Sequence, residues 1–286
     1  MKAQFDQKLI SSFYLWFENK LLESDVAAYQ TGLANTYQYV DAFDVPAGFY
    51  AYQGRYRQLV AENDVSVPNT GIFVGGNFVS GGQANVYTDY NNGRIVFPAS
   101  SGKALTVTSV STIKEVNTYL TNDNEEQVLL ESDFIVDGNT IPKLSQSTKK
   151  LDEKTYFLPA CFIFPANSDN KEFSFGGEED TKTRVRVMVL AKENFVLDAV
   201  LSVFRDKARS CVPIIDFDDF PYGAFFSLKS YPYQYSTLAA AATENSFIQK
   251  VNASRVNNSS NREKQDKKFL IGFLDFDLST LRFPRL

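Results

Sequence analysis

The chain has 286 residues, of which 44% are apolar and 22% charged, and its formal net charge is −5. This length and apolar content exclude a disordered chain and suffice for one large or two smaller domains, while the acidic balance argues against a general nucleic-acid binder. The sequence contains no histidine, which excludes Ser–His and Cys–His nucleophile systems and His-containing zinc sites. It does not exclude every enzyme, because many glycosidases use no histidine.

Residues 3–22 are predicted to form an amphipathic helix, because large apolar side chains recur there at spacings of three and four. Within it, residues 13–17 form an unbroken run of aromatic and aliphatic side chains, which covers more than one helix face. Either the helix packs into its own domain's core, or it docks on a neighbouring subunit. Since some rings must then face away from the chain's own core, we predict an interface formed by Phe13, Tyr14, Trp16 and Phe17.

Residues 36–136 are predicted to be all-β, because strand-like runs alternate there with Gly, Asn and Pro. Residues 71–82 indicate two short strands joined by Gly-Gly-Asn, and Asn92-Gly93 predicts a type I′ turn between two more. The segment 113–120 either continues the sheet or begins a short helix. An antiparallel sandwich or open barrel would close such a set of strands.

The polar segment 138–154 is the expected boundary between domains. It divides the chain into an N-terminal helix (1–35), an all-β domain (36–137), the linker (138–154) and an α+β domain (155–286).

The second half combines strands with one helix. Residues 156–164, 184–190 and 212–215 are typical of buried strands, and 247–256 with 269–276 indicates a long hairpin. Residues 194–208 predict a helix with Asn194 as its N-cap and an apolar stripe of Leu197, Val200, Leu201 and Phe204. The predicted fold is therefore α+β and mostly β, with an α+β sandwich in which one helix packs on a sheet.

A polar loop, 257–268, joins the two strands of that hairpin and is longer than the usual two to about five residues. We expect it to project and to become ordered against a neighbouring subunit. Its predicted interface residues are Asn258, Arg262, Lys264 and Lys267.

Both cysteines, Cys161 and Cys211, lie in apolar runs and are predicted to be buried and unpaired, as in a reducing compartment. The N-terminus lacks the apolar region of a signal peptide, and no stretch is apolar enough to span a bilayer, so synthesis in a cytoplasm and no membrane partner are expected.

Tests for chemical motifs leave one ambiguous feature. The sequence contains no dinucleotide-binding fingerprint, phosphate loop or G-x-S-x-G elbow, so we expect no enzyme activity and no cofactor. The acidic–aromatic segments 216–220 and 275–277 suit a hard cation or acid–base chemistry at Asp216, Asp218 and Asp275. The same alternation is also typical of a strand with Phe on one face and solvated Asp on the other.

Three segments carry a resemblance to a known family: 87–97 (YTDYNNGRIVF), 175–181 (FGGEEDT) followed by 185–190 (VRVMVL), and 194–206 (NFVLDAVLSVFRD). Together they resemble neck and tail-completion proteins of contractile-tailed bacteriophages. The resemblance implies a ring-forming virion subunit at the head–tail junction, assembled in the host cytoplasm. Its expected partners are copies of itself and other virion proteins of the neck, tail or portal complex, with no catalytic residues.

A second function remains open, namely a carbohydrate- or surface-binding β-sandwich such as an adhesin or a tail-fibre adaptor. The tyrosines of residues 231–235 (YPYQY) would then be platforms on which sugars stack.

Overall fold

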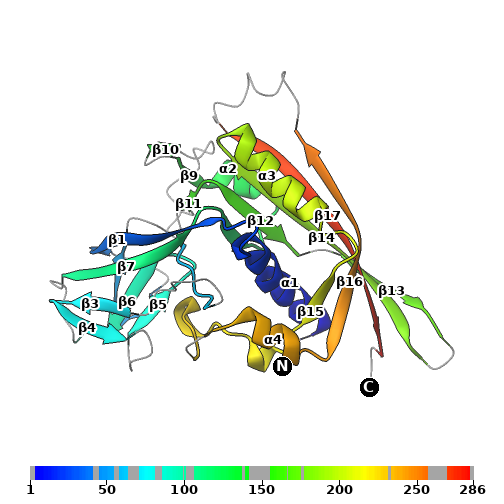
Figure 1. The fold of residues 1–286 in the computed structure, drawn as a ribbon, viewed down its shortest axis with the longest axis horizontal. Coiled ribbons are helices and arrows are strands. Elements are labelled where there is room, and N and C mark those ends of the chain that lie inside the picture. The colour runs from blue at the N-terminus through cyan, green and yellow to red at the C-terminus, as the bar shows by residue number, and fades with distance from the viewer. Residues whose placement is uncertain are drawn as a thin grey trace.

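The computed structural model describes residues 4–40, 45–54, 58–63, 71–80, 86–98, 100, 106–136, 139–141, 155–165, 167–174, 177–230, 233–256 and 269–283. Among these residues the chain is α+β and mostly β, as predicted, with two seven-stranded sheets and one three-stranded sheet. The large sheets curl into half-barrels rather than a flat sandwich, with helix α1 (Phe5–Leu22) between them (Figure 1).

The first sheet has the strand order β4-β3-β7-β1-β2-β6-β5, and every neighbouring pair is antiparallel. Its strands are β1 (Tyr29–Val40), β2 (Phe49–Gln53), β3 (Gly71–Val74), β4 (Asn77–Ser80), β5 (Tyr87–Asp89), β6 (Arg94–Pro98) and β7 (Val107–Lys114). Its own small core consists mainly of inward aromatic and β-branched side chains, among them Tyr37, Tyr52 and Ile95.

The two predicted hairpins of this sheet form, but with different turns. Gly75 and Gly76 both have positive φ, +56° and +86°, as the two-residue turn between β3 and β4 requires. Asp89 of β5 and Arg94 of β6 are the last paired residues of the second hairpin, so its loop is the four residues 90–93. Of these four residues only Gly93 has positive φ. The type I′ turn predicted at Asn92-Gly93 is therefore wrong, because the loop is two residues longer than that turn allows.

The second sheet has the order β15-β16-β17-β14-β12-β8, and β13 pairs with the first part of β14. Its strands are β8 (Asn117–Leu120), β12 (Ala160–Phe164), β13 (Ser168–Glu172), β14 (Glu179–Ala191), β15 (Cys211–Ile214), β16 (Glu244–Arg255) and β17 (Leu270–Arg282). The long hairpin predicted for 247–276 is confirmed as β16 and β17, which pair antiparallel.

Helix α3 (Asn194–Arg205) packs on one face of this sheet through the predicted stripe Leu197, Val200, Leu201 and Phe204, all of them buried. Gly272 of β17 permits the close approach, because a Cβ there would come within 2.9 Å of the Cδ1 of Leu197. The N-cap is Glu193 rather than the predicted Asn194, which is already helical.

The three-stranded sheet lies next to a short helix that the sequence did not predict. Strands β9 (Asp133–Val136), β10 (Asn139–Ile141) and β11 (Thr155–Phe157) follow α2 (Glu125–Glu131), whose N-cap Asn124 accepts a hydrogen bond from the backbone of Gln127. They cover part of the second sheet's other face, where Phe134 and Phe162 belong to one buried cluster.

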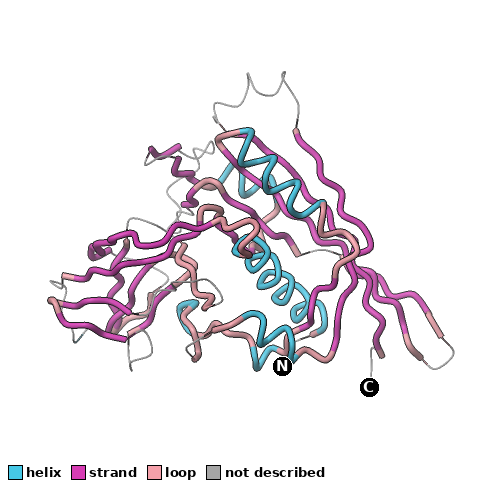
Figure 2. The backbone as a smooth tube through the Cα atoms, viewed as in Figure 1, coloured by secondary structure: helices cyan, strands magenta, loops and turns pink. Residues whose placement is uncertain are grey.

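Strand pairing crosses the boundary expected at 138–154. Strand β8 pairs parallel with β12, and β9 pairs parallel with β11. The segment between β15 and β16, which contains 3₁₀ turns at 217–219 and 224–226 and α4 (Tyr235–Ala241), reaches back to the first sheet, where Tyr90 donates its backbone N–H to Phe226. Figure 2 shows helix α1 at the centre, with strands and loops of both halves around it.

Candidate assembly surface

Helix α1 lies inside its own chain, and its apolar run is completely covered. Phe13, Leu15 and Phe17 are fully buried, Trp16 is 1% exposed and Tyr14 is 2% exposed. The prediction that some of these rings face away from the chain's own core is wrong. Phe13, Tyr14, Trp16 and Phe17 therefore cannot form a subunit interface in this fold.

The physical reason is that the helix is enclosed on two sides. Trp16 packs against Phe204 of α3 and Phe276 of β17, with ring centroids 5.9 Å and 6.1 Å away. On another side, Tyr14 meets Phe226 of the segment between β15 and β16 in a T-shaped contact. A helix covered in this way is expected to be hydrophobic on more than one face.

A buried ion pair joins α1 to the first sheet. The carboxylate of Glu18 pairs with the ammonium of Lys114 on β7 and accepts a 2.6 Å hydrogen bond from the Tyr14 hydroxyl. Burial, and secondarily the charge of Glu18, raises the pKa of Tyr14 well above its ordinary value. The arrangement fixes α1 against the sheet and keeps the phenol protonated.

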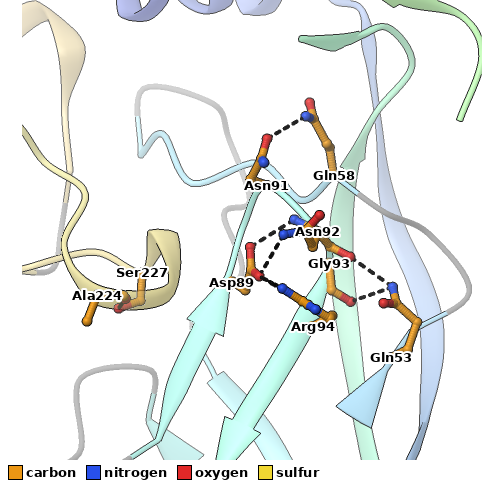
Figure 3. Close-up of polar contacts among 9 residues, drawn as sticks. All are labelled: Gln53, Gln58, Asp89, Asn91, Asn92, Gly93, Arg94, Ala224 and Ser227. Atoms are coloured by element: carbon orange, nitrogen blue, oxygen red, sulfur yellow. Dashed lines mark hydrogen bonds and ion pairs between the residues drawn. The ribbon is translucent and has the colours of Figure 1, made fainter. Parts of the chain in front are cut away.

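The loop between β5 and β6 is held by side-chain hydrogen bonds rather than by turn chemistry alone (Figure 3). Asp89 accepts from the backbone and side-chain amides of Asn92 and pairs with Arg94 at 2.8 Å. The Gln53 side chain donates to the carbonyl of Asn92, and that of Gln58 to the Asn91 side chain. These hydrogen bonds hold the four-residue loop in its observed conformation.

One end of the second sheet extends beyond the core as an arm, defined here as β13 with the following residue (168–173), the start of β14 (179–183) and the end of β17 with the following residue (279–283). All five residues of β13 are exposed, and Figure 1 shows β13 projecting at one end of the long axis. Three large apolar side chains of this region are also exposed, Phe173 (60%), Leu281 (50%) and Phe283 (49%). The arm thus presents apolar surface without contributing that surface to the core.

Several contacts hold the arm in place. The Arg282 guanidinium lies 4.0 Å from the ring centroid of Phe5 at the start of α1, and its Nε donates to Thr181 at 2.7 Å. Ser168 donates to Asp6 at 2.7 Å. These contacts hold the arm in one position relative to α1.

The opposite margin of the same sheet has an open strand edge. Strand β15 pairs with β16 only up to Phe247, and no other described strand pairs with that side of β16 beyond Ile248. Next to the open stretch, a groove of about 520 Å³ separates β16 from α3. Phe195, which is 80% exposed, and Arg255, which is paired with Asp198, line this groove.

The outer face of the second sheet carries a network of ion pairs around a groove of about 590 Å³. Arg186 pairs with Asp275 at 2.6 Å and with Glu125 of α2 at 3.0 Å, and Arg184 pairs with Asp277 at 3.0 Å. The alternation predicted for Asp275-Phe-Asp277 is confirmed, because Phe276 is buried and both carboxylates lie on the outer face. The Arg186–Glu125 pair attaches α2 to the sheet, and the other two pairs join β14 to β17.

The segment 216–220 is not the edge strand that its alternation suggested. Residues 217–219 form a 3₁₀ turn, and Phe217 is exposed instead of lying on a buried face. Asp216 pairs with Lys8 of α1, and this contact raises the pKa of Lys8. No group of three potential metal ligands occurs among the residues that the structure describes.

Predictions were also made for the two cysteines, the tyrosines of 231–235 and four residues of loop 257–268. Cys161 is buried and both thiols are free, as predicted, but Cys211 is exposed because it lies on the outward side of β15. Tyr233 and Tyr235 are buried, so they are not exposed sugar platforms. Asn258, Arg262, Lys264 and Lys267 lie outside the described residues.

None of the helices in the described part of the chain is both long and apolar enough to cross a bilayer. Comparisons with protein-family models, curated proteins and solved structures found no match to this chain.

Proposed function

We propose that this chain is a structural subunit that assembles with copies of itself into a ring, as a virion protein at the head–tail junction of a tailed bacteriophage. The observation that carries the proposal is the arm. Its exposed side chains Phe173, Leu281 and Phe283 lie on a projection whose outer strand buries none of its residues.

In the isolated subunit, the apolar side chains of the arm are exposed to solvent, which is unfavourable, and no contact with the core offsets this exposure. Covering such surface with a neighbouring subunit recovers the hydrophobic contribution, about 25 cal/mol per Å². In the proposed contact the arm packs against a different surface of a second copy, rather than against the arm of that copy. Such head-to-tail contacts generate closed rings when their rotation closes.

The proposed location at the head–tail junction rests on the three segments that resemble neck and tail-completion proteins. One of these segments includes most of β14, whose start belongs to the arm, and another includes α3. The proposed partners are copies of this chain and other virion proteins, and the proposed role is structural, without a catalytic step or a cofactor.

The test is the mass and shape of the purified chain, measured by light scattering and negative-stain microscopy. We expect rings for the natural chain, and monomers of unchanged melting temperature for a variant with Phe173→Ser, Leu281→Ser and Phe283→Ser. Val110→Ser, an exposed apolar residue of β7, is the matched control and is expected to assemble normally. A natural chain that stays monomeric at high concentration would overturn the proposal.

A further inference from the structure

The open edges of β13 and β16 are the two margins of one sheet. Strand β13 pairs with the first part of β14, and the stretch Lys250–Arg255 of β16 pairs with β17 farther along the sheet, so strands β14 and β17 lie between the two edges. They cannot pair within one molecule. Among the described residues, neither edge has a strand beside it.

Strand edges expose unpaired backbone N–H and C=O groups and are templates for the addition of another strand. The two edges match in length, since β13 has five residues and Lys250–Arg255 has six. A contact between them would extend the sheet from one subunit into the next.

The charges of the two edges are complementary. Between Ser168 and Lys182 the chain carries five acidic and two basic residues, and Asp169 and Glu172 lie on β13 itself. The open stretch of β16 carries Lys250 and Arg255 and no acidic residue, although Arg255 also pairs with Asp198 of α3. Pairing β16 with β16 of a second copy would bring like charges together, which disfavours a symmetric two-fold contact.

We propose that β13 of one subunit adds as a strand to β16 of a second copy along Lys250–Arg255, beside α3. This inference rests on the proposed function and identifies the surface that receives the arm. Phe195, exposed in the adjoining groove, then provides an apolar neighbour for the arm's own exposed aromatic residue, Phe173.

Charge reversal tests the pairing. An edge variant, Lys250→Glu with Arg255→Glu, carries acidic residues on both margins, and an arm variant, Asp169→Lys with Glu172→Lys, carries basic residues on both. Each variant alone is expected to stay monomeric, with an apparent Kd for assembly raised more than about tenfold. Lys229→Glu, the same charge change at an exposed residue outside both edges, is the control and is expected to leave assembly unchanged.

A mixture of the edge and arm variants is the decisive sample. Both of its contacts between unlike variants are attractive, the acidic β16 edge with the basic β13 arm and the natural acidic arm with the natural basic edge. The mixture is therefore expected to form assemblies in which the two variants alternate, although neither variant assembles alone. The variant with all four substitutions is expected to form rings again. Melting temperatures and circular dichroism of each monomer separate loss of assembly from loss of folding.

A second measurement is independent of substitution. Backbone amides of Lys250–Arg255 and of Ser168–Glu172 are expected to exchange hydrogen more slowly in the assembled protein than in the monomer. Rings that form without this protection, or that survive both single-margin variants, would overturn the pairing while leaving the proposed function standing. A natural chain that never assembles would overturn both.

Discussion

Phe17 of α1 and Phe204 of α3 stack face to face, with ring centroids 3.8 Å apart and planes 5° from parallel. Phe276 of β17 meets both rings in T-shaped contacts. Residues from the beginning, middle and end of the described chain therefore share one aromatic cluster, which makes α1 a central element of the core.

Trp16→Ala is expected to destabilise the monomer rather than to affect assembly alone. The indole is buried against Phe204 and Phe276, and truncating a buried Trp costs about 3–5 kcal/mol. Urea denaturation measures this as a loss in the free energy of unfolding. The control, Phe195→Ala, removes an exposed ring and is expected to change stability by less than about 0.5 kcal/mol. Equal effects of the two substitutions would contradict the core position of α1.

Lys114→Met is expected to cost about 3–5 kcal/mol, because it leaves the buried Glu18 carboxylate without its ionic partner. Combining it with Glu18→Gln removes that charge and keeps an acceptor for the Tyr14 hydroxyl, so the double variant should recover part of the loss. Chemical denaturation of the two single variants and the double variant gives the coupling energy. A coupling near zero would show that the pair contributes no specific stabilisation.

The protein is expected to lose stability above about pH 10. Burial, the largest cause, raises the pKa of Tyr14 and Tyr222 well above the ordinary 10.0, and also raises that of Tyr235. Their stabilising contribution is complete below pH 10.0 and declines as pH rises, because the unfolded chain then loses protons that the folded chain retains. Each such phenol contributes a slope of about 1.4 kcal/mol per pH unit. Tyr222→Phe should flatten the alkaline limb of a plot of unfolding free energy against pH.

A thiol reagent is expected to label one cysteine of the native protein. Cys211 is exposed, whereas Cys161 is buried and burial also raises its thiol pKa, so that little reactive thiolate forms there. Mass spectrometry of peptides should show label at Cys211 before denaturant is added and at both residues afterwards. In the proposed rings, loss of labelling at Cys211 would show that a neighbour covers β15.

Replacing loop 257–268 with Asn-Gly is expected to leave the subunit folded and to weaken assembly. The strands on either side, β16 and β17, already pair in register up to Arg255 opposite Gly272, so the hairpin does not depend on a long connection. Melting temperature and ring formation are the two measurements. A large fall in the melting temperature would assign the loop to the fold itself.

The sequence was informative where the pattern of apolar side chains has a single explanation. The stripe of α3 and the hairpin of β16 and β17 were predicted because each has one buried side and one exposed side. The burial of α1 was not, because five large residues in a row fit a helix enclosed on two sides as well as one that docks on a partner. That choice depends on Phe226 and Phe276, which are distant in sequence.

The candidate surface was the less predictable part. Strand β13 consists only of polar and charged residues, so it lacks the apolar alternation by which strands are recognised. The exposure of Cys211 could not be predicted for a similar reason, because apolar neighbours in the sequence do not show which face of the strand a residue occupies. Both outcomes are set by pairing with β14 and β16.

The aromatic cluster also has a consequence for synthesis of the chain. Phe13 and Trp16 leave the ribosome long before Phe276, the β17 residue that covers them. Until then the rings of α1 are without their final neighbours, and such surface favours aggregation or chaperone binding. Chains that terminate before β17 should therefore aggregate or be degraded, so that only chains translated through β17 reach the folded state.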